Sequence, residues 1–202
     1  MTPQKYLKEK EFFIFELDNV IYPEKDYLLQ VYYLFAQFIE YGEQISAIEV
    51  LNFMQETFLK DGANGIFEKT SKQFNIPEKY HVNFEMLLHS VRLPLKLLVY
   101  NEVSAFLQAI VLEGKQIFLF VKGSPAMQLN KIKQTEWNGL ERHLKVFFEA
   151  EFETEKNPLK LIMEQHQLDN SKAVLIGCSS FAENAATVNK VDYLNVNELF
   201  NV

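Results

Sequence analysis

The chain has 202 residues, 48% of them hydrophobic, so it can bury a core without disulfides or structural metals. Its formal net charge of -7 comes with no long basic run, which excludes nucleic acid and anionic membranes as partners. Cys178 is the single cysteine, which excludes an intrachain disulfide. Because the N-terminus is polar and the apolar stretches are short, we expect no membrane span and a cytoplasmic protein.

The first expected element is a buried strand at residues 12–17, an apolar run interrupted only by Glu16. A loop follows at Asp18 and Asn19, and Pro23 prevents the strand from continuing. The sequence therefore predicts a strand with charged residues at its carboxyl end.

Helical periodicity begins at residue 26 and extends to about residue 79, with apolar residues at spacings of three and four. A turn cluster at residues 61–65 separates the second and third helices, and Pro77 follows the third. Residues 82–91 form a fourth helical segment. Consecutive helices with short loops predict a small antiparallel bundle.

Strands and helices then alternate to the end of the chain. The expected helices are residues 102–112, 126–133, 158–166 and 181–189, and the expected strands are residues 116–121, 145–148, 173–176 and 191–196. This order predicts an α/β fold with a doubly wound, Rossmann-like parallel sheet and a helical-bundle cap inserted after the first strand. We assign residues 1–23 and 95–202 to the core and residues 24–94 to the cap.

Three segments resemble motifs of the haloacid-dehalogenase-like (HAD) hydrolases. FIFELDNVIYP at residues 13–23 resembles the first motif, in the form found in the nucleotidase-like branch. FLFVKG at 118–123 resembles the second motif, and VLIGCSSFAE at 174–183 the fourth. Lys156 is the nearest match to the lysine of the third motif, although alignment on Pro158 places Glu155 there instead.

The resemblance implies an aspartyl-phosphate phosphohydrolase site in which several positions have changed. In the family, the first motif supplies an aspartate nucleophile and an aspartate acid/base. The second supplies a hydroxyl for the phosphoryl group, and the fourth supplies carboxylates for Mg²⁺. These groups position the reactants and stabilise spreading charge.

Glu16 stands at the nucleophile position, with a side chain about 1.5 Å longer than that of aspartate. We favour a vestigial carboxylate with local partners over an active glutamate nucleophile, because a misplacement of about 1 Å can cost a hundredfold in rate. Asp18 keeps the acid/base position, and two interpretations of it stay open: a remnant of the catalytic pair, or a turn-forming aspartate.

The phosphate-binding position falls on Val121, Lys122 and Gly123, where Val121 supplies no hydroxyl. Lys122 is either a solvated turn lysine or a cation that pairs with Glu16 or Asp18 in place of the metal.

The metal position retains fewer hard oxygen ligands than the family has. Cys178 replaces a metal-binding carboxylate, and a thiol is a poor Mg²⁺ ligand, so we interpret it as a small buried hydrophobe. Glu183 either helps Glu16 and Asp18 to hold a weakly bound cation or caps the following helix.

The combined changes at Glu16, Val121 and Cys178 predict a HAD-like protein that has lost its phosphohydrolase chemistry and acts by binding. The alternative is a weak or divergent Mg²⁺-dependent phosphatase acting on a small phosphorylated metabolite or nucleotide. The first interpretation needs no cofactor and the second needs Mg²⁺. We expect a small anionic or phosphorylated ligand between cap and core, and a homo-oligomer remains open.

Overall fold

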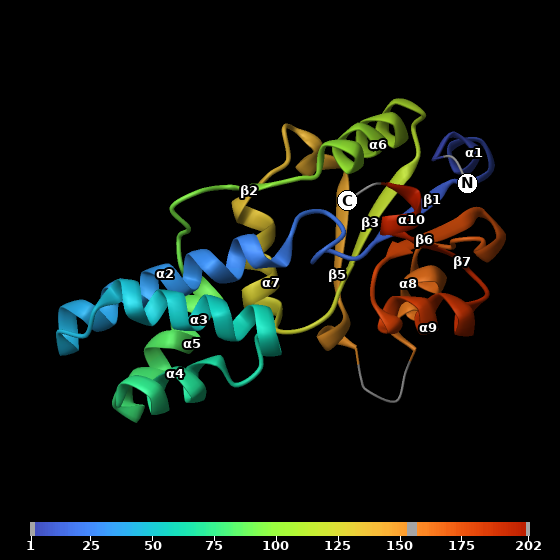
Figure 1. The fold of residues 1–202 in the computed structure, drawn as a ribbon. Helices are drawn as coiled ribbons and strands as arrows, with labels where there is room; N and C mark the ends of the chain where they lie inside the picture. Colours follow the sequence, from blue (N-terminus) through green and yellow to red (C-terminus); the bar gives the residue numbers. More distant parts are fainter. Residues whose placement is uncertain (1–2, 153–156, 201–202) are drawn as a thin grey trace.

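The computed structural model describes residues 3–152 and 157–200. Its centre is a parallel sheet of five strands in the order β5-β3-β1-β6-β7, shown in Figure 1. The strands are β1 (Phe12–Phe15), β3 (Gln116–Val121), β5 (Leu144–Phe148), β6 (Ala173–Gly177) and β7 (Asp192–Asn195). The predicted parallel α/β sheet is therefore confirmed.

The middle strand, β1, is apolar at every position because both faces of the sheet are covered. Phe15 lies beside Leu119 of β3 and Ile176 of β6. Alternate residues contribute to two separate cores, with Phe13 on one face and Ile14 on the other. This arrangement fixes the carboxyl ends of β1, β3 and β6 at one edge of the sheet.

Helices cover both faces of the sheet. Val103 and Leu107 of α6 (Asn101–Leu112) belong to the core that contains Phe13. The opposite core includes buried residues of α8 (Pro158–Gln165) and α9 (Ser180–Asn189). This is the doubly wound arrangement that the alternating sequence predicts.

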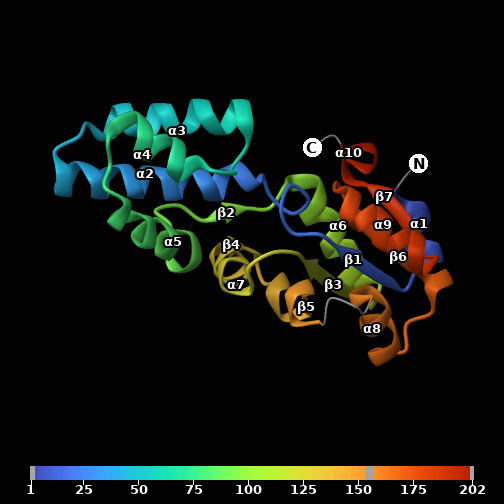
Figure 2. The same ribbon diagram turned by 90° about the horizontal axis from the view of Figure 1, so that it is seen from below.

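A block of four helices lies beside the sheet and not on either of its faces (Figures 1 and 2). The helices are α2 (Glu24–Glu43), α3 (Ala47–Asp61), α4 (Ile66–Phe74) and α5 (His81–Ser90). Helix α7 (Pro125–Gln134), which follows β3, packs against α5. The four predicted helices are present, and the proposed cap boundaries at residues 24 and 94 stay a prediction.

The remaining elements are short. They are α1 (Pro3–Glu9), α10 (Val196–Leu199), β2 (Leu97–Leu98), β4 (Thr135–Glu136), and the 3₁₀ turns at Glu78–Tyr80, Leu140–His143, Glu149–Glu151 and Asn170–Lys172. The structure differs from the sequence prediction in several details, among them a helix at residues 3–9, an end of β1 before Glu16, and the start of α10 at Val196, where a strand residue was expected. Tertiary contacts decide such element ends more than local sequence does.

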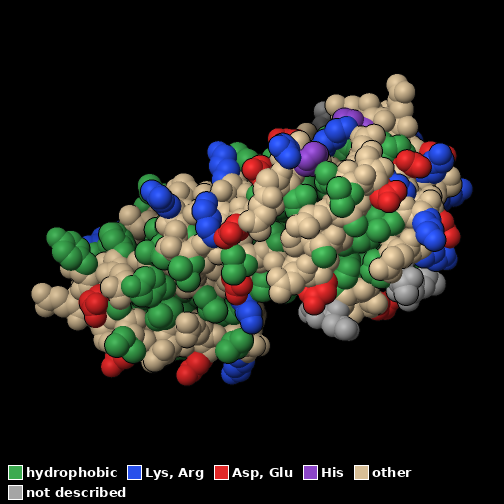
Figure 3. All heavy atoms as spheres, turned by 90° about the horizontal axis from the view of Figure 1, so that it is seen from above, with side chains coloured by type: hydrophobic (Ala, Val, Ile, Leu, Met, Phe, Trp, Pro, Cys, Tyr) green, Lys and Arg blue, Asp and Glu red, His purple; other side chains and the backbone are tan. Residues whose placement is uncertain are grey.

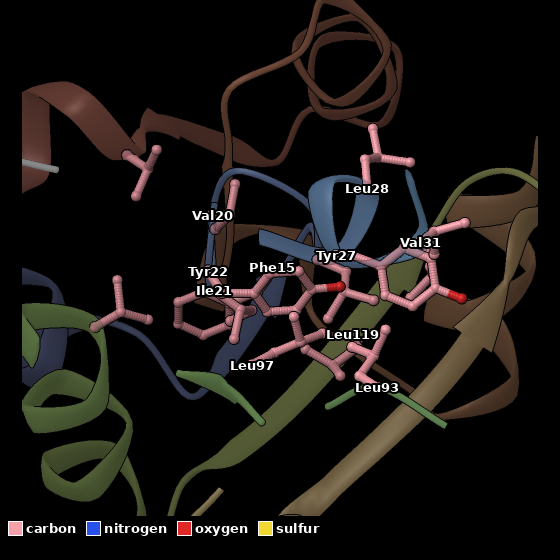
Figure 4. Close-up of a cluster of buried hydrophobic side chains, with 14 of the residues drawn as sticks. Phe15, Val20, Ile21, Tyr22, Tyr27, Leu28, Val31, Leu93, Leu97 and Leu119 are labelled. Carbon is pink, nitrogen blue, oxygen red and sulfur yellow. The ribbon is translucent and has the colours of Figure 1, made fainter. Parts of the chain in front are cut away.

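Three consecutive residues of the loop between β1 and α2 are as buried as the residues of β1. Val20, Ile21 and Tyr22 are fully buried, and Figure 4 shows them gathered with Phe15 and with Tyr27 of α2. The apolar loop therefore anchors the start of the helical block to the end of β1.

The helical block also carries exposed apolar side chains. Tyr41 is 91% exposed, and other large apolar residues of these helices are exposed as well: Ile48, Leu59, Val82 and Met86. In Figure 3, hydrophobic side chains gather over the part of the visible surface that the helical block forms. Within the described residues, no helix combines the length and apolar character needed to cross a bilayer.

Candidate active site

Glu16 and Asp18 lie just beyond the carboxyl end of β1, where the chain turns into α2. The N–H of Glu16 still donates to the carbonyl of Ile176 at 3.0 Å, which continues the pairing with β6. Asn19 adopts a φ of 60°, in the left-handed region that asparagine tolerates. Its side-chain oxygen accepts from the N–H of Glu24 at 3.0 Å, at the start of α2. The turn thus places both carboxylates at the edge of the sheet.

The Glu16 side chain is folded against the turn between β6 and α9. Its Oε2 accepts from the backbone N–H groups of Cys178 at 2.9 Å and Ser179 at 3.1 Å, and its Oε1 accepts from the Ser179 hydroxyl. Gly177 makes this possible, because a Cβ there would lie 2.6 Å from Oε2. Backbone N–H groups before a helix attract negative charge, so the carboxylate is held by the start of α9.

Asp18 is held by a buried lysine. The Nζ of Lys131, on α7, lies 2.9 and 2.8 Å from the two carboxylate oxygens, and the lysine side chain is 0% exposed. The Tyr22 hydroxyl donates to Oδ1 at 3.1 Å and the Gln128 amide donates to Oδ2 at 2.9 Å. Lys131 Nζ also lies 5.2 Å from the centre of the Tyr27 ring. The ammonium group of Lys131 therefore compensates the charge of Asp18, whose side chain is 20% exposed.

The second-motif segment offers an apolar wall where the family has a hydroxyl. Val121 ends β3 and is 2% exposed. Gly123 adopts a φ of 101°, a conformation that favours glycine, and the Gln128 amide nitrogen packs near it. This segment brings no side-chain donor to the carboxylates.

Lys122 does not pair with Asp18. Its Nζ lies 4.8 Å from the centre of the Phe181 ring, and its side chain is exposed. The cation that pairs with Asp18 is Lys131 from the following helix. Lys131 therefore has the position beside Asp18 that one interpretation of the sequence gave to Lys122.

Cys178 lies against the same loop. Its Sγ is 3.8 Å from the Asp18 carbonyl oxygen, to which the thiol donates a weak hydrogen bond. Burial raises the pKa of the thiol to about 11, with further contributions from the carboxylates of Glu16 and Asp18. The thiol therefore keeps its proton at neutral pH.

Two predicted positions lie away from this cluster. Glu183 is exposed in the first turn of α9, where its N–H donates to the Ser179 carbonyl. The cap of α9 is Ser179, whose hydroxyl accepts from the Ala182 N–H at 3.1 Å, and both alternatives for Glu183 stay predictions. Lys156 and the competing Glu155 lie outside the described residues.

A cavity of about 190 Å³ brings most of the predicted positions together. Its walls are Glu16, Leu17, Asp18, Asn19, Glu24, Phe120, Val121, Lys122, Gln128, Cys178 and Ser179. The strand ends thus converge as parallel-sheet topology requires. The cavity carries three carboxylates, and Lys131 lies behind one of them.

The donor set does not fit the Mg²⁺ ion that the fold implies. Mg²⁺ needs hard oxygen ligands in near-octahedral geometry. Glu16 instead accepts three hydrogen bonds, and Asp18 faces an ammonium group and, through its carbonyl, the thiol of Cys178. Among residues 3–152 and 157–200, no group of three or more acidic, thiol or imidazole side chains is arranged to hold a metal.

Sequence reasoning missed the partners of the two carboxylates. Lys131 and Gln128 lie three residues apart on α7 and so share one face of the helix, which is the only signal that links them. Ser179 stands inside the fourth-motif segment but was given no role. A lysine in a helix is ordinarily solvated, so its burial here was not predictable from composition.

No protein-family model matches the sequence, and no curated protein matches it either. Solved structures do. A hydrolase from Streptococcus pneumoniae TIGR4 is 15% identical, with 92% of each chain covered and a TM-score of 0.54. The magnesium-bound HAD hydrolase YfnB from Bacillus subtilis is 12% identical, with 92% of this chain and 87% of that chain covered and a TM-score of 0.58.

A HAD-like hydrolase from Xanthomonas campestris is 14% identical, with 92% of this chain and 80% of that chain covered and a TM-score of 0.53. Likeness at such low identity establishes architecture, while function depends on the site. The parallel sheet, the helical insertion after β1 and these similarities together show that the chain has the fold of the HAD-like hydrolases.

Proposed function

We propose that this chain is a non-catalytic protein of the HAD-like fold that acts by binding. The observation that carries the proposal is the hydrogen bonding of the Glu16 carboxylate in the cavity wall, where it accepts from the N–H groups of Cys178 and Ser179 and from the Ser179 hydroxyl. A nucleophile must have a free oxygen close to the phosphorus atom and in line with the leaving group. Glu16 would have to give up these hydrogen bonds to meet that requirement.

The state of Asp18 supports the same proposal. An acid/base group has to exchange a proton with the reactants, and the Asp18 carboxylate is instead surrounded by Lys131, Tyr22 and Gln128. Burial, followed by the neighbouring Asp18 charge, raises the pKa of the Tyr22 phenol, so this hydroxyl remains a donor.

The test is phosphate release from a broad panel of phosphomonoesters, with and without Mg²⁺. We expect no turnover from the wild type under either condition. The triple variant Glu16→Asp/Val121→Thr/Cys178→Asp restores the family residues, and we expect it to gain Mg²⁺-dependent turnover. Mn²⁺ binding followed by electron paramagnetic resonance should appear in the triple variant only.

The second candidate is a weak Mg²⁺-dependent phosphatase with Glu16 as nucleophile. The observation that favours this candidate is that Glu16 and Asp18 line the same cavity. It predicts turnover by the wild type that requires Mg²⁺ and disappears in Glu16→Gln. That result would overturn the non-catalytic proposal. The small anionic or phosphorylated ligand expected between cap and core stays a prediction for both candidates, as the bound molecule of the first and as the substrate of the second.

We also propose that the chain forms a homo-oligomer through its helical block. Its support is the set of exposed apolar side chains on the helical block, of which Tyr41 on α2 is the most exposed. Light scattering on the purified chain measures the oligomeric state directly. Tyr41→Lys should weaken an assembly that uses this face and should leave a monomer unchanged.

A further inference from the structure

The outer face of α2 carries no charged side chain along most of its length. Residues 27–39 are thirteen consecutive uncharged residues, in a chain in which 23% of the residues are charged. Buried helical positions explain part of this run, because Tyr32, Phe35 and Ile39 face the core of the helical block. The exposed positions in the same run need a different explanation, since solvated helix faces ordinarily carry charges.

Three exposed residues of α2, each four positions from the next, form one ridge along this face. Tyr33 is 45% exposed, Gln37 is exposed and Tyr41 is 91% exposed. Residues four apart are neighbours on a helix surface. Half-buried Leu34 and exposed Phe38 lie along one side of the ridge. These five residues are the α2 stripe.

The apolar surface widens from the stripe toward α5. A groove with a volume of about 220 Å³ lies there and is lined by Phe38, Asn83, Met86, Leu87, Ser90 and Val91. The Met86 side chain is 60% exposed. Aromatic residues and methionine are enriched in the centres of protein interfaces, where charged residues are rare. The stripe and the groove therefore have the composition of a protein interface.

The charges around the stripe argue against two classes of partner. The charged residues of α2 are Lys25 and four acidic residues, which are Glu24, Asp26, Glu40 and Glu43. A helix that binds an anionic bilayer or nucleic acid has lysine and arginine beside its contact face. The α2 surface has the opposite charge, so the partner that fits it is a protein.

The polar groups on the stripe are able to pair with copies of themselves. An amide and a phenol each contain both a donor and an acceptor, so Gln37 can bond to Gln37 of a second chain and Tyr33 to Tyr41 of that chain. A carboxylate or an ammonium group has no such complementarity to its own kind. Two chains that each have a net charge of -7 repel one another, and an uncharged face lets them approach with the least repulsion.

We infer that the α2 stripe is the interface of a two-fold symmetric dimer, in which the α2 helices of two copies cross in antiparallel directions. In such an interface the same surface is used by both chains, and each contact occurs twice. With the two-fold axis at Gln37, Tyr33 of each chain packs against Tyr41 of the other, since both lie four residues from the axis. This inference rests on the proposed homo-oligomer and identifies its surface and symmetry.

The size of the stripe limits the strength of the dimer. Helix α2 has 20 residues and is about 30 Å long. A standard interface buries about 800 Å² per partner, and a single pair of crossed helices covers less. We therefore expect monomer and dimer to exchange, with the dimer predominant only at high concentration.

The experiment measures the dissociation constant of the intact chain by sedimentation equilibrium at concentrations up to about 1 mM. Gln37→Glu places two carboxylates at the axis, and Gln37→Lys places two ammonium groups there. We expect each variant alone to dimerise at least about tenfold more weakly than the wild type, because like charges then face each other. An equimolar mixture of the two variants should recover the wild-type affinity or exceed it, since opposite charges meet in the mixed dimer.

Gln108→Glu and Gln108→Lys are the matched controls. They make the same changes at an exposed position of α6, which packs on the parallel sheet, and they should leave the dissociation constant unchanged. Because Gln37 is exposed, its variants should keep the fold, and circular dichroism verifies this.

Equal dissociation constants for the wild type and the Gln37 variants overturn the inference, because the chain then associates through another surface while the homo-oligomer stands. Weak association of both variants without recovery in the mixture also overturns it, because the stripe then meets a different surface of the second copy. A wild type that stays monomeric at about 1 mM overturns both the interface and the homo-oligomer. The phosphate-release assay tests the non-catalytic proposal separately.

Discussion

Two carboxylates separated by one residue are stabilised in different ways on the two sides of the site. On the core side, Glu16 is held by the backbone and hydroxyl groups of the β6–α9 turn. On the side of the helical block, Asp18 is held by the buried ammonium of Lys131. Backbone donors are built into the fold, whereas a lysine can be removed by one substitution. The Asp18 side should therefore be the more vulnerable.

The largest effect is expected for Lys131→Met. Methionine has a similar length but no charge, so the substitution leaves Asp18 partly buried and uncompensated, with a loss of about 3–5 kcal/mol in the free energy of unfolding. Urea denaturation of the variant and the wild type measures this loss.

The double variant Asp18→Asn/Lys131→Met is the matched control. It removes both charges, and we expect it to recover most of the stability lost in Lys131→Met, because replacing both members of a buried pair is often nearly neutral. Additive losses in the double variant would show that the two side chains do not stabilise each other.

On the Glu16 side, Gly177→Ala should have the next largest effect. The added Cβ would lie 2.6 Å from Glu16 Oε2 and 2.7 Å from the Ala182 Cβ, so both the carboxylate and the first turn of α9 must move. We expect a loss of about 1–3 kcal/mol in urea denaturation. In a Glu16→Ala background, Gly177→Ala should lower the free energy of unfolding by less, because one of the two close contacts is gone. An equal loss in both backgrounds would mean that Glu16 does not lie over Gly177.

Glu16→Gln sharpens the comparison with Lys131→Met, because it also removes one charge from the site. The amide oxygen can still accept from the N–H groups of Cys178 and Ser179, and the amide nitrogen can donate to the Ser179 hydroxyl. We expect a loss of about 1 kcal/mol in the free energy of unfolding. A loss as large as that of Lys131→Met would contradict the proposed difference between the two sides.

The smallest effect concerns Cys178, whose thiol pKa is raised to about 11, chiefly by burial. At pH 8.5, alkylation by iodoacetamide should be roughly a hundredfold slower in the native chain than in the unfolded chain, since only the thiolate reacts. The native state keeps this proton to higher pH than the unfolded state does, so the contribution of the thiol to stability is lost as the pH rises from about 8.5 to 11. Equal alkylation rates in the two states would refute the raised pKa.

Hydrophobic patterning predicted most of the fold. The strand at residues 116–121 was predicted with the observed bounds, and the helices and the other strands with ends shifted by a few residues. The buried runs of β1, β3 and β6 have the continuous apolar character of a sheet covered on both faces. The helix at Pro3–Glu9 was missed, because its sequence is mainly polar and Tyr6 is its one buried residue.

The sequence by itself determined which residues lie at the end of β1 and beside it, because parallel strands bring their carboxyl ends to one edge. It could not determine which donors face Glu16 and Asp18. Lys131 follows Asp18 by 113 positions, and only the packing of α7 against the helical block brings the ammonium to the carboxylate. Side-chain pairing over such separations depends on how helices pack, and local periodicity does not contain that information.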